Sequence, residues 1–102
     1  MRSVIISRSL DVLAGIRLAG IEGVYCKDAE ELEKNFTEYK EKAGLGIIVL
    51  TESDFSIIKD EVIKVKLSKK LPLVVTIPDE EGLKDKDFIL RYIKESIGVK
   101  VG

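Results

Sequence analysis

Hydrophobic and polar residues alternate along this chain in blocks that predict strands and helices in turn. The short, nearly continuous apolar runs are expected to be strands, and they lie at Ser3–Ser7, Gly23–Cys26, Gly46–Leu50 and Leu73–Ile77. Continuous apolar character is typical of parallel strands that are buried on both faces. Helical patterns separate these runs, as in a series of strand–helix units. The chain is therefore predicted to form a parallel sheet covered by helices.

Helices are expected between and after these strands. The first three occupy about Ser9–Gly20, about Ala29–Ala43, and a helical region that begins after Thr51 and closes at Lys69 and Lys70. A charged loop at Asp79–Lys86 leads to a last helix at about Asp87–Ile97. We interpret residues 1–102 as one α/β domain, a small doubly wound, flavodoxin- or Rossmann-like fold. Its four-stranded parallel sheet is predicted to have the order 2-1-3-4 with right-handed crossovers.

The first helix has more apolar surface than packing on one sheet requires. Its apolar residues fall on two faces, one with Val12, Leu13, Ile16 and Ala19 and the other with Leu10, Ala14 and Leu18. The last helix likewise spreads its apolar residues over about half of its circumference, wider than a stripe of roughly 100°. A helix that is apolar on two faces is either enclosed in a core or pressed against a partner. Because this domain has little core to spare, we favour a partner.

Charge and length exclude several classes of function. Lys and Arg number 17 against 18 Asp and Glu, so the formal net charge of −1 provides no field for nucleic acid or an anionic membrane. No apolar run approaches the roughly 20 residues of a membrane helix, and the N-terminus does not resemble a signal peptide. We expect a cytoplasmic protein without direct membrane insertion.

Catalytic and cofactor motifs are also missing from the sequence. The chain has no His, which removes the usual general base and metal ligand, and it has no phosphate-binding loop for ATP. Gly44-Leu45-Gly46 precedes a strand, so it cannot be a dinucleotide-binding fingerprint. Cys26 is expected to be a small buried hydrophobe, with a reactive, nucleophilic thiol as the alternative. No cofactor, metal or catalytic residue is predicted.

Ligands of parallel sheets bind at the carboxyl ends of the strands, so any chemistry is expected at these positions. Ser7-Arg8-Ser9 follows the first strand and is typical of a helix N-cap with a solvated arginine. Thr51-Glu52 ends the third strand, and Glu52 and Asp54 suit the first turn of a helix, where acids are favoured. A receiver domain would need acidic residues after the first strand to hold Mg²⁺, and here Ser7 and Arg8 occupy these positions. An active receiver domain is therefore not expected, and a degenerate receiver-like signalling domain is the alternative.

Several segments resemble the F subunit of the V-type and A-type rotary ATPases. Asp11–Ile21 is similar to the family's Asp-x-x-x-Gly-Phe-Arg-Leu-Ala-Gly stretch, Gly46–Glu52 to its third strand, and Leu71–Pro78 to its Leu-Pro-Leu-x-x-x-Ile-Pro strand. Ile97-Gly98 resembles the end of the family's sequence. The resemblance runs in order along the chain from Met1 to Gly102. The chain departs from the usual family residues at Arg8, Ser9, Ile16 and Thr76. Because Arg8 and Ser9 stand where the family usually has Gly-Asp, we expect no role for an acidic first loop.

The resemblance implies a non-catalytic central-stalk subunit of a V-type or A-type ATP synthase. Such a subunit binds the coiled-coil D subunit of the central stalk and couples ATP synthesis or hydrolysis to proton or sodium transport. Its further partners would be the catalytic A/B hexamer and the ring-docking stalk subunit, in a complex that is peripheral to the membrane on the cytoplasmic side. The C-terminal helix would be mobile and regulatory, and its docking on the rest of the domain is the alternative. The expected contact residues are Leu10, Asp11, Ala14, Arg17, Leu18, Phe88, Arg91, Tyr92 and Lys94.

Overall fold

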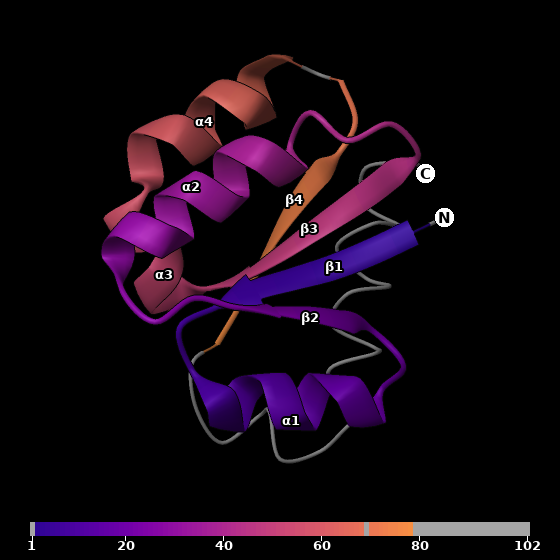
Figure 1. The fold of residues 1–102 in the computed structure, drawn as a ribbon. Helices are drawn as coiled ribbons and strands as arrows, with labels where there is room; N and C mark the ends of the chain where they lie inside the picture. Colours follow the sequence, from indigo (N-terminus) through magenta and orange to yellow (C-terminus); the bar gives the residue numbers. More distant parts are fainter. Residues whose placement is uncertain (1, 69, 79–102) are drawn as a thin grey trace.

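Strands and helices alternate along residues 2–68 and 70–78, the part of the chain that the computed structural model describes (Figure 1). The elements, in chain order, are β1 (Arg2–Ser7), α1 (Leu10–Leu18), β2 (Glu22–Tyr25), α2 (Ala29–Tyr39), β3 (Leu45–Thr51), α3 (Glu52–Ile57), α4 (Lys59–Ser68) and β4 (Leu73–Ile77). The predicted loop at 79–86 and last helix at 87–97 lie outside the described residues.

The four strands form one parallel sheet in the order β2-β1-β3-β4, which confirms the predicted order 2-1-3-4. Val4 of β1 pairs with Glu22 of β2 and with Ile48 of β3, and Ile48 in turn pairs with Val74 of β4. The central strand β3 is buried along its whole length. The carboxyl ends of β1 and β3 therefore lie next to each other at one edge of the sheet.

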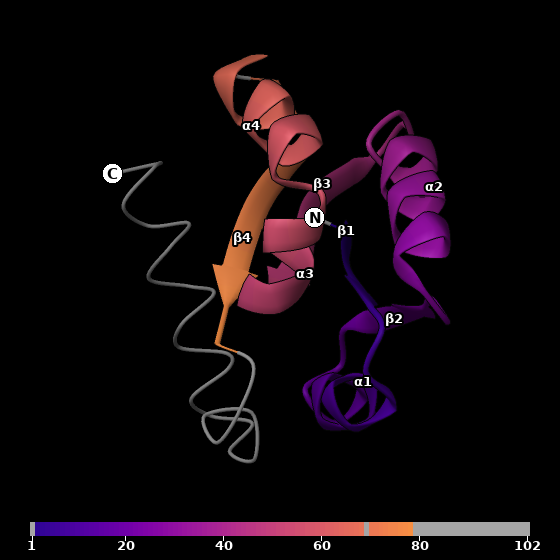
Figure 2. The same ribbon diagram turned by 90° about the vertical axis from the view of Figure 1, so that its left-hand side faces the viewer.

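Helices cover both faces of the sheet, as Figures 1 and 2 show from two directions. In the described part of the chain, α1 lies on one face and α2, α3 and α4 lie on the other. Successive residues of β1 point to different cores: Ile5 packs with Leu13 and Ile16 of α1, whereas Val4 and Ile6 pack with the α2 side. This two-sided burial explains why the strands read as continuous apolar runs.

The third helical region differs from its prediction, because it is broken into two helices at Ile58. Ile58 leaves the helical conformation with φ −114° and ψ 31°. Its side chain is only 4% exposed and packs in the core with Val62 of α4. The break lets both α3 and α4 bury apolar residues on the same face of the sheet.

The second helix is also shorter than predicted, since α2 ends at Tyr39 and not at Ala43. Residues 40–44 form tight turns, in which the Lys42 amide donates to the Tyr39 carbonyl at 3.1 Å. Gly44 has φ +82°, a conformation that favours glycine. Ala43 is exposed, so no packing holds a further helical turn, and the chain reverses to bring Leu45 into the core.

Candidate partner-binding face and the carboxyl edge of the sheet

The α1 helix is defined at both ends by local chemistry. The Ser9 hydroxyl accepts a hydrogen bond from the Val12 amide at 3.2 Å, as expected of an N-cap. At the other end Gly20 has φ +81°, and its amide donates to the Arg17 carbonyl at 3.0 Å. The Ile21 amide reaches the Ile16 carbonyl, which completes a Schellman-type C-terminus. The sequence Ser9–Gly20 therefore determines where this helix begins and ends.

Both apolar faces predicted for α1 are found, and one is buried whereas the other is exposed. Val12, Leu13 and Ile16 are buried against the sheet. Leu10 and Leu18 are 65% and 77% exposed, and Ala14 between them is also exposed. Leu10 and Leu18 are the first and last residues of the helix. The second apolar face is thus uncovered by any described part of the chain.

Charged residues flank this apolar face. Asp11 in the first turn and Arg17 in the last turn are both exposed. Their positions also suit the helix dipole, which favours acids near the N-terminus and bases near the C-terminus. The five candidate residues predicted on this helix therefore share one exposed face: Leu10, Asp11, Ala14, Arg17 and Leu18. The other four candidates, Phe88, Arg91, Tyr92 and Lys94, lie outside the described residues.

Close packing holds α1 against the edge strand β2. A Cβ atom placed on Gly23 would lie 2.9 Å from Cδ2 of Leu13, closer than real Cβ contacts allow. The absence of a side chain at Gly23 therefore lets the helix approach the strand. Leu13 fills this contact, so the face with Leu10 and Leu18 points away from the sheet.

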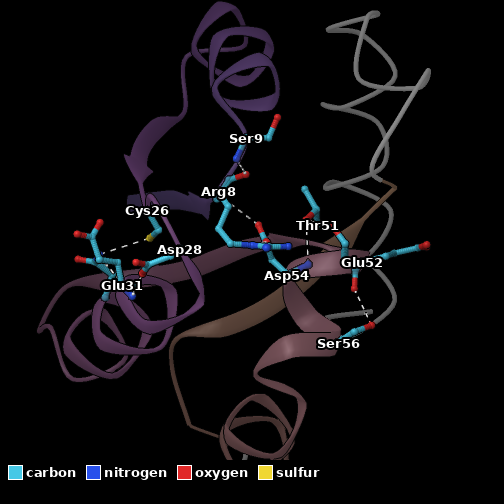
Figure 3. A network of polar contacts seen from close by, with 12 residues as sticks. Arg8, Ser9, Cys26, Asp28, Glu31, Thr51, Glu52, Asp54 and Ser56 are labelled. Atoms are coloured by element: carbon cyan, nitrogen blue, oxygen red, sulfur yellow. Dashed lines mark hydrogen bonds and ion pairs between the residues drawn. The ribbon is translucent and has the colours of Figure 1, made fainter.

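An ion pair closes the carboxyl edge between β1 and β3 (Figure 3). Nε of Arg8 lies 2.6 Å from Oδ1 of Asp54, and the Arg8 backbone amide donates to Oδ2 at 3.2 Å. The Asp54 side chain is only 3% exposed and that of Arg8 is 35% exposed. The prediction that Arg8 is a solvated residue beside an N-cap was wrong, because adjacent strands bring it to the Asp54 carboxylate.

The surrounding hydroxyl groups complete this polar network. Thr51 is the N-cap of α3, and its hydroxyl accepts from the Asp54 amide at 3.2 Å. Ser7 is fully buried, and its hydroxyl accepts from the Ser9 amide at 3.0 Å. The loop that starts α1 is therefore tied to the turn that starts α3. Sequence reasoning missed this pairing, although opposite charges after two strands predicted to be neighbours were a usable signal.

The same edge lacks the features of a phosphoryl-transfer site. Asp54 is the acid nearest the end of β3 that points inward, and its carboxylate is engaged by Arg8. Glu52 is exposed at the start of α3, where it suits the helix N-terminus. No cluster of three or more potential metal-binding side chains occurs within residues 2–68 and 70–78. These observations do not favour the receiver-like alternative.

Cys26 is completely buried beyond the end of β2. Its amide donates to the Ser7 carbonyl at 2.9 Å, and Nδ2 of Asn35 lies 3.4 Å from its sulfur atom. Burial raises the pKa of the Cys26 thiol, an effect that outweighs the lowering by Asn35. Because the thiolate is the nucleophilic form, this cysteine is poorly suited to covalent catalysis.

Comparisons with known proteins agree with the resemblance seen in the sequence. Residues 4–93 match the protein family described as ATP synthase (F/14-kDa) subunit. The chain is 32% identical over 95 residues to the F subunit of the A-type ATP synthase of Methanococcus aeolicus, covering 90% of this chain and 91% of that protein. It is 34% identical over 92 residues to the corresponding protein of Methanococcoides burtonii, with 89% of each chain covered.

A third relative comes from a further genus. The F subunit of the A-type ATP synthase of Thermococcus kodakarensis is 34% identical over 97 residues, again with 89% of each chain covered. Among the described helices, none is long and apolar enough to cross a membrane. Both the family match and the relatives extend over most of the chain. This chain therefore belongs to the family of ATP synthase (F/14-kDa) subunits.

Proposed function

We propose that this chain is a non-catalytic central-stalk subunit of an A-type or V-type ATP synthase, and that it binds the coiled-coil D subunit through the exposed face of α1. In the assembled complex it couples ATP synthesis or hydrolysis in the A/B hexamer to proton or sodium transport. The ring-docking stalk subunit is its further neighbour. The complex is peripheral to the membrane on its cytoplasmic side.

The observation that carries this proposal is the pair of exposed leucines on α1. Leu10 and Leu18 expose most of their side chains, at 65% and 77%. They are eight residues apart, which places them about 80° apart around a helix with 3.6 residues per turn, within about a quarter of its circumference. Ala14 lies between them, and its small side chain leaves room at the centre of the face. A second helix can therefore approach closely along this line.

The geometry of the face suits a coiled-coil partner in particular. A coiled coil presents a regular ridge of apolar side chains with charged residues beside it. The α1 face offers two leucines for such a ridge, and Asp11 and Arg17 for the flanking charges. Since these two charges have opposite signs, they also favour one orientation of the partner helix. The face therefore fits a partner that is apolar at its centre and charged at its margins.

Replacing Leu18 with Lys tests this proposal directly. A lysine near a helix C-terminus does not oppose the helix dipole, so folding should be preserved. Loss of a leucine that the proposed interface buries should cost about 1.5–3 kcal/mol, which weakens binding to the purified D subunit about tenfold to a hundredfold. Co-elution on size exclusion and titration by calorimetry measure the effect.

Ile57→Lys is a matched control for this experiment. Ile57 is the last residue of α3, as Leu18 is the last residue of α1, and it is 43% exposed on the opposite side of the sheet. This variant should bind the D subunit as the parent chain does. Equal affinity of Leu18→Lys and the parent would contradict the proposal. So would a failure of the parent chain to bind the D subunit or to change ATP hydrolysis by the assembled complex.

A further inference from the structure

The helix α4 lies on the opposite side of the sheet from α1 (Figures 1 and 2). A second exposed apolar surface lies at its C-terminal end. Leu67 is 74% exposed near the C-terminus of the helix, and Leu71 is 60% exposed four residues later. Ile63, one turn before Leu67, is 36% exposed. Leu67 and Leu71 are nearly as open to solvent as the leucines of α1. We call this region the basic surface of α4. It consists of Ile63, Leu67, Leu71 and the exposed lysines Lys64, Lys66 and Lys70.

A hollow extends this surface toward the start of the sheet. It has a volume of about 380 Å³ and is lined by the α2–β3 loop, residues 40–46, together with Leu71. Leu45 forms part of its apolar lining, and the charged residues of the lining are Lys40, Glu41 and Lys42. An exposed leucine beside a hollow of this size is suited to receive an apolar side chain from another protein.

The charge around the surface has one predominant sign. The segment 62–78 has no acidic residue and carries the exposed Lys64, Lys66 and Lys70. Glu61, just before it, is paired with Lys64 at 3.8 Å and with Lys40 at 3.7 Å, so lysines outnumber acids around the surface. Nζ of Lys66 lies 5.5 Å from the centre of the Phe55 ring, and Nζ of Lys42 lies 4.3 Å from that of Tyr39. Both ammonium groups rest on neutral rings, which leaves their charge available to a partner. The surface is therefore complementary to an acidic partner.

We infer that the basic surface of α4 binds an acidic amphipathic helix of another subunit in the assembled complex. Apolar residues three or four apart on such a helix would contact Leu67 and Leu71 and enter the hollow. Its carboxylates would meet the lysines. An anionic membrane is a poorer fit, because an interfacial helix needs a broad apolar face, whereas Ile63 and Leu67 form one narrow row that Leu71 continues. The inference does not depend on α1, since the two surfaces lie on opposite sides of the sheet.

Cysteine protection tests whether the surface is covered. Cys26 is the sole cysteine and is buried with a raised thiol pKa, so Leu67→Cys supplies a single reactive site. Its alkylation by a maleimide is compared between the isolated chain and the purified assembled ATP synthase, with modification of this chain read by mass spectrometry. If a partner covers the surface, alkylation of Leu67→Cys should be at least about tenfold slower in the complex than in the isolated chain. Equal rates in both samples would overturn the inference.

Two control positions make this result specific. Glu30 is exposed in the first turn of α2, ten residues before Lys40 of the hollow, and Glu30→Cys should react at similar rates in both samples. Leu18→Cys reports on the α1 face in the same assay. Protection at Leu18 without protection at Leu67 would refute this inference alone, whereas the reverse result would refute the proposed function alone.

Cross-linking then tests the nature of the partner. A benzophenone maleimide attached to Leu67→Cys in the assembled complex should, after irradiation, become joined to an acidic amphipathic helix of another subunit. Attachment to a second copy of this chain, to lipid, to nucleic acid or to a segment without acidic residues would overturn the inference. Adding Lys70→Glu should raise the alkylation rate of Leu67→Cys in the complex several-fold, about fivefold at low salt, because like charges then meet. An unchanged rate would contradict the assigned charge complementarity.

Discussion

Arg8 and Asp54 are the residues whose interaction most affects the architecture of the carboxyl edge. They are 46 positions apart in the chain, yet the neighbouring strands β1 and β3 bring them to 2.6 Å. The nearly buried Asp54 carboxylate has lost its water and accepts from both the side chain and the backbone of Arg8. Removing one partner of such a pair leaves the other without compensation. The pair therefore stabilises the approach of the first loop to the third strand.

Replacing Asp54 with Ala should accordingly destabilise the fold. We expect the free energy of unfolding to fall by about 2–3 kcal/mol, because the half-buried Arg8 and its amide lose their acceptor. Urea denaturation followed by circular dichroism measures this change. Glu52→Ala is the control, since Glu52 is an exposed acid two positions away, and its loss should cost no more than about 0.5 kcal/mol. Equal effects of both substitutions would show that the ion pair has no special role.

At the scale of the element, α1 combines a locally defined helix with two apolar faces. Its ends are determined by Ser9 and Gly20, and Gly23 on the neighbouring strand lets the helix pack closely. Rigid placement matters for the proposed binding face, because a helix that frays would have to be ordered when a partner binds. The N-cap therefore supports both the fold and the proposed interface.

Ser9→Ala tests the contribution of this cap. Loss of the hydrogen bond from the Val12 amide should lower the free energy of unfolding by about 1 kcal/mol. For a domain of this size the midpoint of thermal unfolding should fall by about 4–8 °C. Ser56→Ala is a matched control, because the Ser56 hydroxyl bonds the Glu52 carbonyl within α3, and alanine is a good helix former. A comparable loss in both variants would contradict a specific capping role.

At the scale of the whole molecule, the sheet separates two exposed apolar surfaces. One is the face of α1 with Leu10 and Leu18, and the other is the basic surface of α4 with Leu67 and Leu71. The buried strands β1 and β3 lie between them. A small domain with two such surfaces can bridge two neighbours in a larger assembly. This arrangement agrees with membership of a family of ATP synthase subunits.

Independence of the two surfaces leads to a prediction for the double variant. Leu18→Lys and Leu67→Lys should each weaken binding of this chain to an ATP synthase preparation that lacks it. Their free-energy effects should add within about 0.5 kcal/mol, because the sites are distant and share no residue. Competition with the labelled parent chain measures the apparent Kd. A deviation from additivity of more than about 1 kcal/mol would indicate that both leucines meet the same partner segment.

The sequence pattern was sufficient for the strands, their order and the type of fold. Continuous apolar runs such as Leu45–Leu50 identify buried strands without any tertiary information. The sequence also predicted two apolar faces on α1, and the structure decides that the face with Leu10 and Leu18 is the exposed one. The break at Ile58 was not predictable from periodicity, because Ile58 continues the apolar face shared by Phe55 and Val62. Only its packing in the core requires the backbone to leave the helix there.

The sequence by itself therefore determined the α/β architecture and the family, because both follow from local periodicity and from residues matched in order along the chain. Tertiary structure alone decided which polar residues meet. Arg8 and Asp54 each suited a solvated position when considered separately, and they form an ion pair because β1 and β3 are adjacent. The basic surface of α4 likewise arises only when the α2–β3 loop folds beside Leu71. Local patterns specify which surfaces a segment can bury, whereas contacts between distant segments depend on how the sheet assembles them.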